Sequence, residues 1–477
     1  MINNPTRPPI PDDEASAARW NHTAMRRRML SGQWAQDLRQ ALAREVDATR
    51  LRSWGEGDLT KNIFRSVVRQ LSVLYDREPV ISHETPEAAA KLSAVLGEAG
   101  VWALATRLQM YTLGMREAAY RIAFVKNAAG DPALQFRIVP PDLLIGDAHP
   151  DEPDVPTMIA EYRLRYETPG VHGSEVIWTR DVFDIRDPNF PIYRVESADG
   201  KADLSAVYLG GDMSGENYPY RKADGRPCLP FVLYHAERTN QLFDAFEGIE
   251  LVEGSLIVAV LWTFWRHCVR DCSWPQRYAV GVRPAGGFTV DDNDRNMAYI
   301  PTDPASLLNF EPSGEGGATL GQFAAGIDPK TLGDSIRNYA ADLAQDFGMS
   351  PSDVTRIAAD PRSGYAIALS REGVRHAQRR FEPQFRRGDL DMLETAAAVW
   401  NWHTGEALPE TGYRIHYPGI PLSDAEKEAL IKNWEAQAAL GVASPVDLYM
   451  AIHGVSRETA TAALSRIDQE RRQYLTQ

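Results

Sequence analysis

Three cysteines are the residues of this chain best suited to metal or redox chemistry. Cys268 and Cys272 lie one helical turn apart if this segment is a helix, and His267 is adjacent to them. A structural zinc site takes four ligands, and the side chain of His267 falls on a different face of such a helix. An odd number of cysteines argues against a disulfide framework, Cys228 being the third. We therefore expect buried, reduced thiols, and we predict no metal and no cofactor.

The catalytic spacings of common enzymes are missing from the sequence. It has no phosphate-binding loop of the Gly-x-x-x-x-Gly-Lys type, no Gly-x-Ser-x-Gly elbow, no His-Glu-x-x-His helix and no Cys-x-x-Cys pair. The glycine-rich run 314–326 offers backbone N–H groups for a phosphate, but no lysine follows it at the required place. A plain loop is the simpler interpretation, and we predict that the chain is not an enzyme.

An acidic cluster, Asp291, Asp292 and Asp294, resembles half of a calcium-binding loop. The glycine expected at the sixth position is Asn296 and the glutamate expected at the twelfth is Thr302, so an EF-hand is not predicted. A solvated turn and an acidic tip that binds another protein remain the two interpretations.

A basic stripe is predicted along a helix late in the chain, because arginines recur every four residues there: Arg371, Arg375 and Arg379. This face is solvated, or it pairs with acidic groups of a neighbouring subunit, or it contacts DNA phosphate. Pro383 removes a backbone donor, which predicts a bend near 379–381.

The composition is that of a folded globular protein of several structural units. The chain has 477 residues, of which 44% are hydrophobic and 24% charged, and its net charge is -14. This charge argues against binding nucleic acid by bulk attraction. The most apolar run, 256–264, has about half of the ~20 residues that a bilayer span needs, and the polar N-terminus does not predict a signal peptide.

The order of the expected elements predicts a predominantly helical α+β fold. Helices are expected over 12–78 and 86–113, and a period of two over 118–235 indicates strands. A long helix is expected over Asn240–Asp271, and Trp262, Phe264 and Trp265 make it apolar almost all round. A helix with such exposed aromatic residues needs partners, which neighbouring subunits can supply.

The C-terminal segment carries the clearest helix signals. Ser423 with Glu426 forms a capping box, Ser444-Pro445 supplies a second cap, and Ser456 begins a last helix. Three short helices are expected over 423–477.

The order of these parts resembles the bacteriophage portal protein family, the head-to-tail connector ring of phage capsids. Local segments similar to that family are 61–75, Ile138-Val-Pro-Pro-Asp142, Ser363-Gly-Tyr-Ala-Ile-Ala-Leu369, Leu440-Gly-Val-Ala-Ser-Pro445 and 468–472. The serine-glycine segment has one residue more before its leucine than the family pattern. The resemblance covers nearly the whole chain, and it rests on the order in which these segments follow one another.

The resemblance implies a portal fold with the following parts: a wing at 12–238 (helices, then mixed β), a first stem helix at 240–272, a β-containing clip at 273–328, a second stem helix at 329–347, a tunnel loop at 348–362, a kinked wing helix and strand at 363–422, and a helical crown at 423–477.

The resemblance also implies function and partners. A homo-oligomeric ring of twelve subunits, assembled in the host bacterial cytoplasm, sits at the capsid vertex of the virion and conducts double-stranded DNA during packaging and ejection. It contacts the major capsid protein, the terminase large subunit and a head-completion or tail adaptor protein; no membrane is involved. The residues implied to face DNA are Asp353, Arg356, Asp360 and Arg362. Those implied to face the terminase and adaptor are Asp291, Asp292, Asp294 and Arg295. The inter-subunit residues are Trp262, Phe264, Trp265, Arg371, Arg375 and Arg379.

Three alternatives remain. The chain is another phage head–tail connector component, an uncharacterised soluble enzyme, or a monomeric partner-binding scaffold. A connector of that kind is usually shorter and lacks a clip between two stem helices, and an enzyme needs convergent titratable groups that the sequence does not gather.

Overall fold

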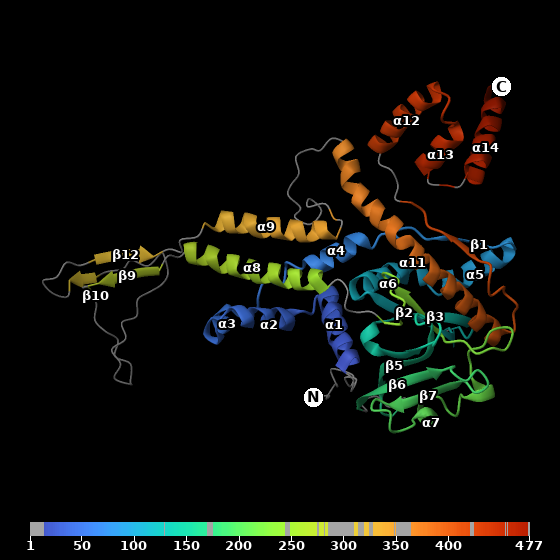
Figure 1. Cartoon of the computed structure of the whole chain (residues 1–477), viewed down its shortest axis with the longest axis horizontal. Helices are drawn as coiled ribbons and strands as arrows, with labels where there is room; N and C mark the ends of the chain where they lie inside the picture. The colour runs from blue at the N-terminus through green and yellow to red at the C-terminus, as the bar shows by residue number, and fades with distance from the viewer. Residues whose placement is uncertain are drawn as a thin grey trace. The chain divides into compact units, whose positions relative to one another are not determined.

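The structure is a computed structural model with two compact units (Figure 1). The first unit comprises Met1–Gln33, Phe64–Val252 and Ala344–Gln477, and the second comprises Trp34–Ile63 and Glu253–Leu343. The residues that the structure describes are 14–127, 129–168, 175–243, 249–273, 276–280, 282–284, 310–312, 319–323, 328–347, 349, 364–419, 424–453, 455 and 457–475.

Helices from the N-terminal part of the chain build one side of the first unit: α1 (Glu14–Ser31), α4 (Ile63–Leu71), α5 (Pro86–Glu98) and α6 (Val101–Met115). Helices α1 and α6 approach closely at Gly114, where a Cβ atom would lie 2.6 Å from a methyl carbon of Leu30. Gly100 joins α5 to α6 with φ +64°, a conformation that favours glycine. In the described part of the chain no single helix has the length and hydropathy of a membrane span, although α5 and α6 together reach it as a pair bent by 73°.

A three-stranded antiparallel sheet lies at the centre of the first unit. Its order is β3 (Pro132–Val139), β2 (Glu117–Lys126) and β8 (Phe231–His235). Strand β2 pairs with both neighbours, and its first six residues are buried because α6 and a long late helix, α11 (Gly364–Thr404), pack against it. The buried part of the strand therefore carries apolar residues on both faces, interrupted by Glu117 and Arg121.

A second sheet is a four-stranded antiparallel meander. It runs in sequence order through β4 (Leu144–Ala148), β5 (Pro156–Tyr166), β6 (Val176–Asp184) and β7 (Ile192–Ser197). Short helical segments flank it: η1 (Pro141–Leu143), α7 (Ser205–Tyr208) and η2 (Gly215–Asn217). The two sheets confirm the period-two prediction over 118–235.

Helix α11 spans 41 residues and continues through Pro383. The bend predicted near 379–381 stays a prediction. From Phe385 onward one face is buried, and it packs against β8 and β2. Beyond the helix, β13 (Arg414–His416) pairs with β1 (Val80–Ser82), joining distant parts of the chain.

The second unit is built around two antiparallel helices, α8 (Ile249–Ser273) and α9 (Pro329–Asp346), which lie side by side in Figure 1. Between them in the chain, β9 (Gln276–Val280) pairs with β12 (Thr319–Phe323), and β10 (Val282–Pro284) pairs with β11 (Phe310–Pro312). The earlier helices α2 (Ala35–Glu45) and α3 (Ala48–Trp54) complete the unit.

The chain ends in three helices of the first unit: α12 (Asp424–Ala439), α13 (Pro445–His453) and α14 (Arg457–Leu475). Ser444 and Asp447 exchange hydrogen bonds at the start of α13, so the predicted cap at Ser444 is confirmed.

Mixed helix and sheet confirm the predicted α+β class. The predicted start of the long helix at Asn240 is wrong. Residues 240–243 are not helical, and Asn240 has φ 56°, a left-handed conformation that a helix cannot contain. The described helix begins at Ile249.

Candidate functional site

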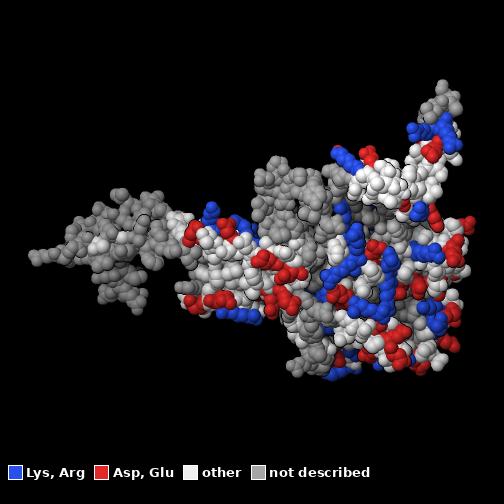
Figure 2. All heavy atoms as spheres, turned by 45° about the horizontal axis from the view of Figure 1, so that its top comes forward, with Lys and Arg blue, Asp and Glu red and all other residues white. Residues whose placement is uncertain are grey.

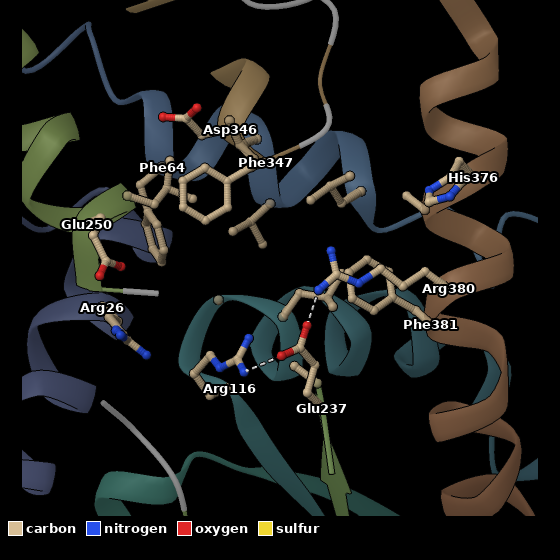
Figure 3. A pocket seen from close by; sticks show the side chains of 18 residues that line it. Arg26, Phe64, Arg116, Glu237, Glu250, Asp346, Phe347, His376, Arg380 and Phe381 are labelled. Carbon is tan, nitrogen blue, oxygen red and sulfur yellow. Dashed lines mark hydrogen bonds and ion pairs between the residues drawn. The ribbon is translucent and has the colours of Figure 1, made fainter. Parts of the chain in front are cut away.

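A cavity of about 440 Å³ lies within the first unit. Figure 3 shows side chains from α1, α4, α6, α11 and the ends of α8 and α9 converging on it. Apolar groups form much of its wall: Phe64, Val67, Val68, Leu71, Leu113, Leu251, Phe347 and Phe381. The charged side chains at the wall are Arg26, Arg116, Glu237, Glu250, Asp346 and Arg380, and His376 also lies there.

Glu237 pairs with two arginines at the wall of this cavity. Arg116 donates a hydrogen bond of 3.1 Å to its Oε2, and Arg380 pairs with its Oε1, as the dashed lines in Figure 3 show. Burial by itself raises the pKa of Glu237, but the two guanidinium groups outweigh it and hold that pKa below its usual value. The carboxylate therefore links α6 to α11 as a charged bridge.

Three of the charged groups of the cavity, Arg116, Glu237 and Arg380, are thus paired with one another. Among the residues that the structure describes, no group of three His, Cys, Asp or Glu side chains is placed to hold a metal ion. His267, the neighbour of Cys268 in the sequence, is buried and stacks on Trp54 with ring centroids 4.3 Å apart. It takes the role of a core aromatic residue.

A fully buried carboxylate, Asp389, lies on α11 below a cluster of tyrosines. Tyr75 and Tyr417 donate hydrogen bonds of 2.8 Å and 2.5 Å to its Oδ2, and Tyr234 donates one of 2.8 Å to its Oδ1. Burial raises the pKa of Asp389 to about 6, although the three hydroxyls lower it in part. This cluster ties α11 to the segment after α4, to β8 and to the end of β13.

A second buried carboxylate, Asp181 on β6, connects the two sheets. Arg121 on β2 donates to its Oδ2 at 2.8 Å, and Arg165 on β5 binds both of its oxygens. Burial raises the pKa of Asp181, but these guanidinium groups outweigh the effect and lower it to about 2. Arg121 also donates to Glu161 at 2.9 Å, so one guanidinium spans two acidic groups.

The aromatic residues predicted to face neighbouring subunits are packed within their own unit to different degrees. Trp262 is only 8% exposed, so the expectation that it lies on an exposed face is wrong. Its ring lies 5.0 Å from Nζ of Lys61 and contacts Trp265 edge-on. Trp265 and Phe264 are half-buried; Trp265 donates to the carbonyl of Pro329 at 2.8 Å, and Phe264 meets Trp54 edge-on.

The basic stripe of α11 is present as a helical face. Arg379 is exposed and Arg375 half-buried, whereas the side chain of Arg371 lies outside the described residues. Figure 2 shows a band of Lys and Arg side chains across the first unit. Several arginines further along α11 have acidic partners in the same chain: Arg380 pairs with Glu237, Arg386 with Glu382 and Arg387 with Asp154.

Both predicted loop sites lie outside the described residues. They are the DNA-facing set, Asp353, Arg356, Asp360 and Arg362, and the terminase-facing set, Asp291, Asp292, Asp294 and Arg295. Their assignments stay predictions.

Sequence reasoning missed the residues that gather at Asp389 and Glu237, because they are far apart in the chain. It also missed the packing of 34–63 on α8, where the backbone N–H of Asp58 donates to Thr263 at 2.9 Å. A Cβ atom at Gly57 would lie 2.6 Å from Leu38, so this glycine marks a close approach within 34–63 and gives no signal of the packing on α8.

Comparison with known proteins finds similarity at the level of solved structures. No family model matches the chain, and no curated protein matches it. A chain of the virion of a native gene transfer agent (GTA) particle is similar with a TM-score of 0.42 and 11% identity, covering 83% of this chain and 91% of that chain.

Chains of GTA necks are similar to the same degree. One is from the neck of an empty particle computed with C6 symmetry, with a TM-score of 0.41, 12% identity, and 82% of this chain and 89% of that chain covered. Another is from the neck of a native particle computed with C12 symmetry, with a TM-score of 0.41, 10% identity, and 82% and 88% covered. The solved structures similar to this chain thus include chains of a gene transfer agent particle and of its neck.

Proposed function

We propose that this chain is a portal-type subunit, one copy of a ring at the capsid vertex of a phage or phage-like particle. The ring conducts double-stranded DNA during packaging and ejection, and it docks the terminase large subunit and then a head–tail adaptor. The chain acts as a structural component of the virion and not as an enzyme.

The observation that carries the proposal is the pair α8 and α9 with the β segments between them. A Cβ atom at Gly254 would lie 2.7 Å from Leu343, and the indole of Trp265 reaches the carbonyl of Pro329, so the helices are antiparallel and in close contact. Strand pairs β9–β12 and β10–β11 follow α8 and precede α9. A helix, a small β part and a returning helix are the order expected of a stem, a clip and a second stem.

The rest of the chain supports the same assignment by its order. After α9 come the segment 348–363, the 41-residue helix α11, strand β13 and the three C-terminal helices. These correspond in sequence order to a tunnel loop, a long wing helix with its strand, and a crown.

In this assignment the loop 348–362 projects Asp353, Arg356, Asp360 and Arg362 toward DNA. The mixture of both charges suits a surface along which a polyanion slides without being trapped, and the net charge of -14 adds to this. Deleting 351–360 in the particle is expected to impair DNA packaging. Unchanged packaging contradicts the role of this loop.

The acidic tip, Asp291, Asp292 and Asp294 with Arg295, is proposed to face the terminase and later the adaptor. Reversing its three acidic charges is expected to weaken binding of both partners in a pull-down at low salt. If the terminase and the adaptor bind the variant as well as the wild type, the assignment is wrong and the cluster is a solvated turn.

The ring contacts are proposed to involve Phe264, Trp265 and the arginines Arg371, Arg375 and Arg379. Phe264 and Trp265 retain exposed area for a neighbouring copy, whereas Trp262 supports the contact from within its own unit.

The deciding experiment is native mass spectrometry of the purified chain, with negative-stain imaging of the same sample. A closed ring of one kind of subunit with a central hole supports the proposal. Two results together overturn it: the purified chain is a stable monomer at all concentrations, and deletion of its gene leaves DNA packaging unaffected. A chain required only after packaging is a head–tail adaptor instead.

A further inference from the structure

A cluster of charged side chains that joins the two sheets of the first unit holds more positive than negative charge. Each of its four guanidinium groups contacts one or both of its two carboxylates, so the formal charge of the cluster is +2. We call this group the intersheet cluster; its members are Arg121, Arg137, Arg163, Arg165, Glu161 and Asp181.

The four arginines use their donors unequally. Arg121 on β2 donates to both carboxylates, and Arg165 on β5 binds both oxygens of one of them. In the described part of the chain, the side chains of Arg137 on β3 and Arg163 on β5 each contact a single carboxylate. Because a guanidinium group has five N–H donors, Arg137 and Arg163 keep donors for a further acceptor.

The two arginines with spare donors lie at open edges of the sheets. Strand β3 is an edge strand, since its sheet has the order β3–β2–β8. The pairing of β4 with β5 ends at Glu161, and among the described strands none continues it beside Arg163. The side chains of Arg137 and Arg163 are 40% and 33% exposed, against 7% for Arg121. A solute can therefore reach the first two arginines and not the third.

Electrostatics distinguish the arginines in the same way. Burial by itself lowers the pKa of Arg121, but Glu161 and Asp181 outweigh it and raise that pKa. For Arg137 burial is the largest effect and lowers the pKa to about 10; Arg163 and Arg121 act in the same direction, and Glu161 opposes them only in part. The positive charge at Arg137 and Arg163 is thus incompletely compensated within the protein.

A buried donor of the cluster also lacks an acceptor. Nε of Arg121 is buried and has no hydrogen-bond partner among the described residues. An unsatisfied buried donor in a native protein indicates an ordered water molecule or an ion. Arg121 and Arg137 lie directly opposite one another on β2 and β3, so this donor belongs to the neighbour of an exposed arginine.

We propose that Arg137 and Arg163 bind a phosphate group at the exposed side of the intersheet cluster. Each arginine presents a planar fork of donors that suits two oxygens of an oxyanion. The charge of the cluster matches a dianion, and a phosphate monoester carries about −1.5 to −2 at pH 7. The ligand is inorganic phosphate or the terminal phosphate of a phosphomonoester such as a nucleotide. Glu161 holds Arg137 in place and weakens binding by its own negative charge.

Equilibrium dialysis of the full chain against radiolabelled inorganic phosphate, at neutral pH and constant ionic strength, measures the affinity. Arg137→Gln and Arg163→Gln are each expected to weaken binding about tenfold. The matched control Arg414→Gln removes the same charge at an exposed position of β13 and should bind like the wild type. Glu161→Gln removes a competing negative charge and should strengthen binding about tenfold, which a purely structural role of the cluster does not predict.

The absence of saturable binding to the wild type overturns the inference, and so does an equal affinity of all three arginine variants. An unchanged or weaker affinity of folded Glu161→Gln also overturns it. Circular dichroism shows whether each variant is folded, and if Glu161→Gln is not, the arginine variants decide. Unlabelled adenosine monophosphate distinguishes the sources: displacement of the label assigns the site to phosphomonoesters, and retention assigns it to the free ion. Because this measurement does not depend on the oligomeric state, a negative result leaves the proposed ring, and with it the proposed function, standing.

Discussion

The hydroxyl of Tyr417 donates a hydrogen bond of 2.5 Å to Oδ2 of Asp389, which is 1% exposed. Asp389 sits on α11, and Tyr417 follows β13. Because the carboxylate is withdrawn from water, each donor around it has a measurable effect on stability and on its titration.

In the wild type, the contribution of Asp389 to the free energy of unfolding is expected to decrease as the pH rises. Asp389→Asn is expected to remove this pH dependence. Burial raises the pKa of Asp389 from 3.8 to about 6, so the folded protein binds this proton more tightly than the unfolded chain. The resulting stability is present below pH 3.8 and is lost as the pH rises through about 6. Urea unfolding of wild type and variant gives the free energy of unfolding of each, and the wild-type value minus the variant value should fall by about 2.4 kcal/mol between pH 4 and pH 8. A difference independent of pH contradicts this.

Tyr417→Phe is expected to lower the free energy of unfolding by about 1.5–3 kcal/mol at pH 7, since it removes a buried donor to a charged group. Tyr413→Phe is the matched control. Tyr413 is also buried, and its hydroxyl has no hydrogen-bond partner among the described residues. Equal effects of the two changes would show that packing, and not the hydrogen bond, determines the result.

Asp181→Asn is expected to have the opposite pH signature. The guanidinium groups lower the pKa of Asp181 from 3.8 to about 2, so its stabilising effect is present above 3.8 and is lost as the pH falls through about 2. The variant should lose about 3–5 kcal/mol at pH 7, because it leaves buried arginines without their partner.

The loss of stability caused by Asp181→Asn should become smaller as the solution is acidified. Urea unfolding of wild type and variant at pH 7 and at pH 3 measures this loss at each pH. Asp131→Asn, at an exposed turn, is the control and should change stability little at either pH. A loss of equal size at both pH values is incompatible with an ion-pair role for Asp181.

Gly254→Val is expected to separate α8 from α9. Even a Cβ atom at this position would lie 2.7 Å and 2.8 Å from the two methyl carbons of Leu343, and overpacking of this kind costs about 1–3 kcal/mol. Gly97→Ala in α5 is the contrasting change, because nothing lies within 4 Å of its Cβ position and alanine favours a helix by roughly 1 kcal/mol. Thermal unfolding should show opposite shifts; a stabilising Gly254→Val excludes the close contact.

Cys228 is expected to resist alkylation in the folded protein. It is 8% exposed, and burial raises the pKa of its thiol to about 12, so little thiolate forms at pH 8. Iodoacetamide labelling followed by peptide mass spectrometry should modify the half-buried Cys268 and Cys272 first. Labelling of Cys228 at the same rate as in urea would contradict its burial.

Local patterns in the sequence predicted local structure well. Alternation at 120–125 and 158–165 indicated strands that appear as β2 and β5, and the Ser444 cap begins α13 as expected. These signals depend on neighbouring residues and need no knowledge of the rest of the fold. The start of α8 was missed because nothing in the apolar spacing revealed the left-handed backbone at Asn240.

Long-range packing was beyond the reach of the sequence. Trp262 was expected to be exposed because α8 is apolar on most sides, but Lys61 and Trp265 cover it. The partners of Asp389 come from positions 75, 234 and 417, and no periodicity links such distant residues. A buried ionised group is recognised only once its donors have been placed in space.

The division of the second unit between two stretches of chain has a consequence for biosynthesis. Residues 34–63 leave the ribosome long before the helix on which Trp54 stacks, since its partner His267 lies on α8. At roughly 10 residues per second, synthesis leaves this early segment without its partner for on the order of 20 s. Its apolar side chains Trp34, Leu38 and Leu42, each at most 1% exposed in the finished fold, lack the rest of their unit during that interval. The nascent chain is therefore most exposed to aggregation or chaperone capture at this segment until α8 has been made.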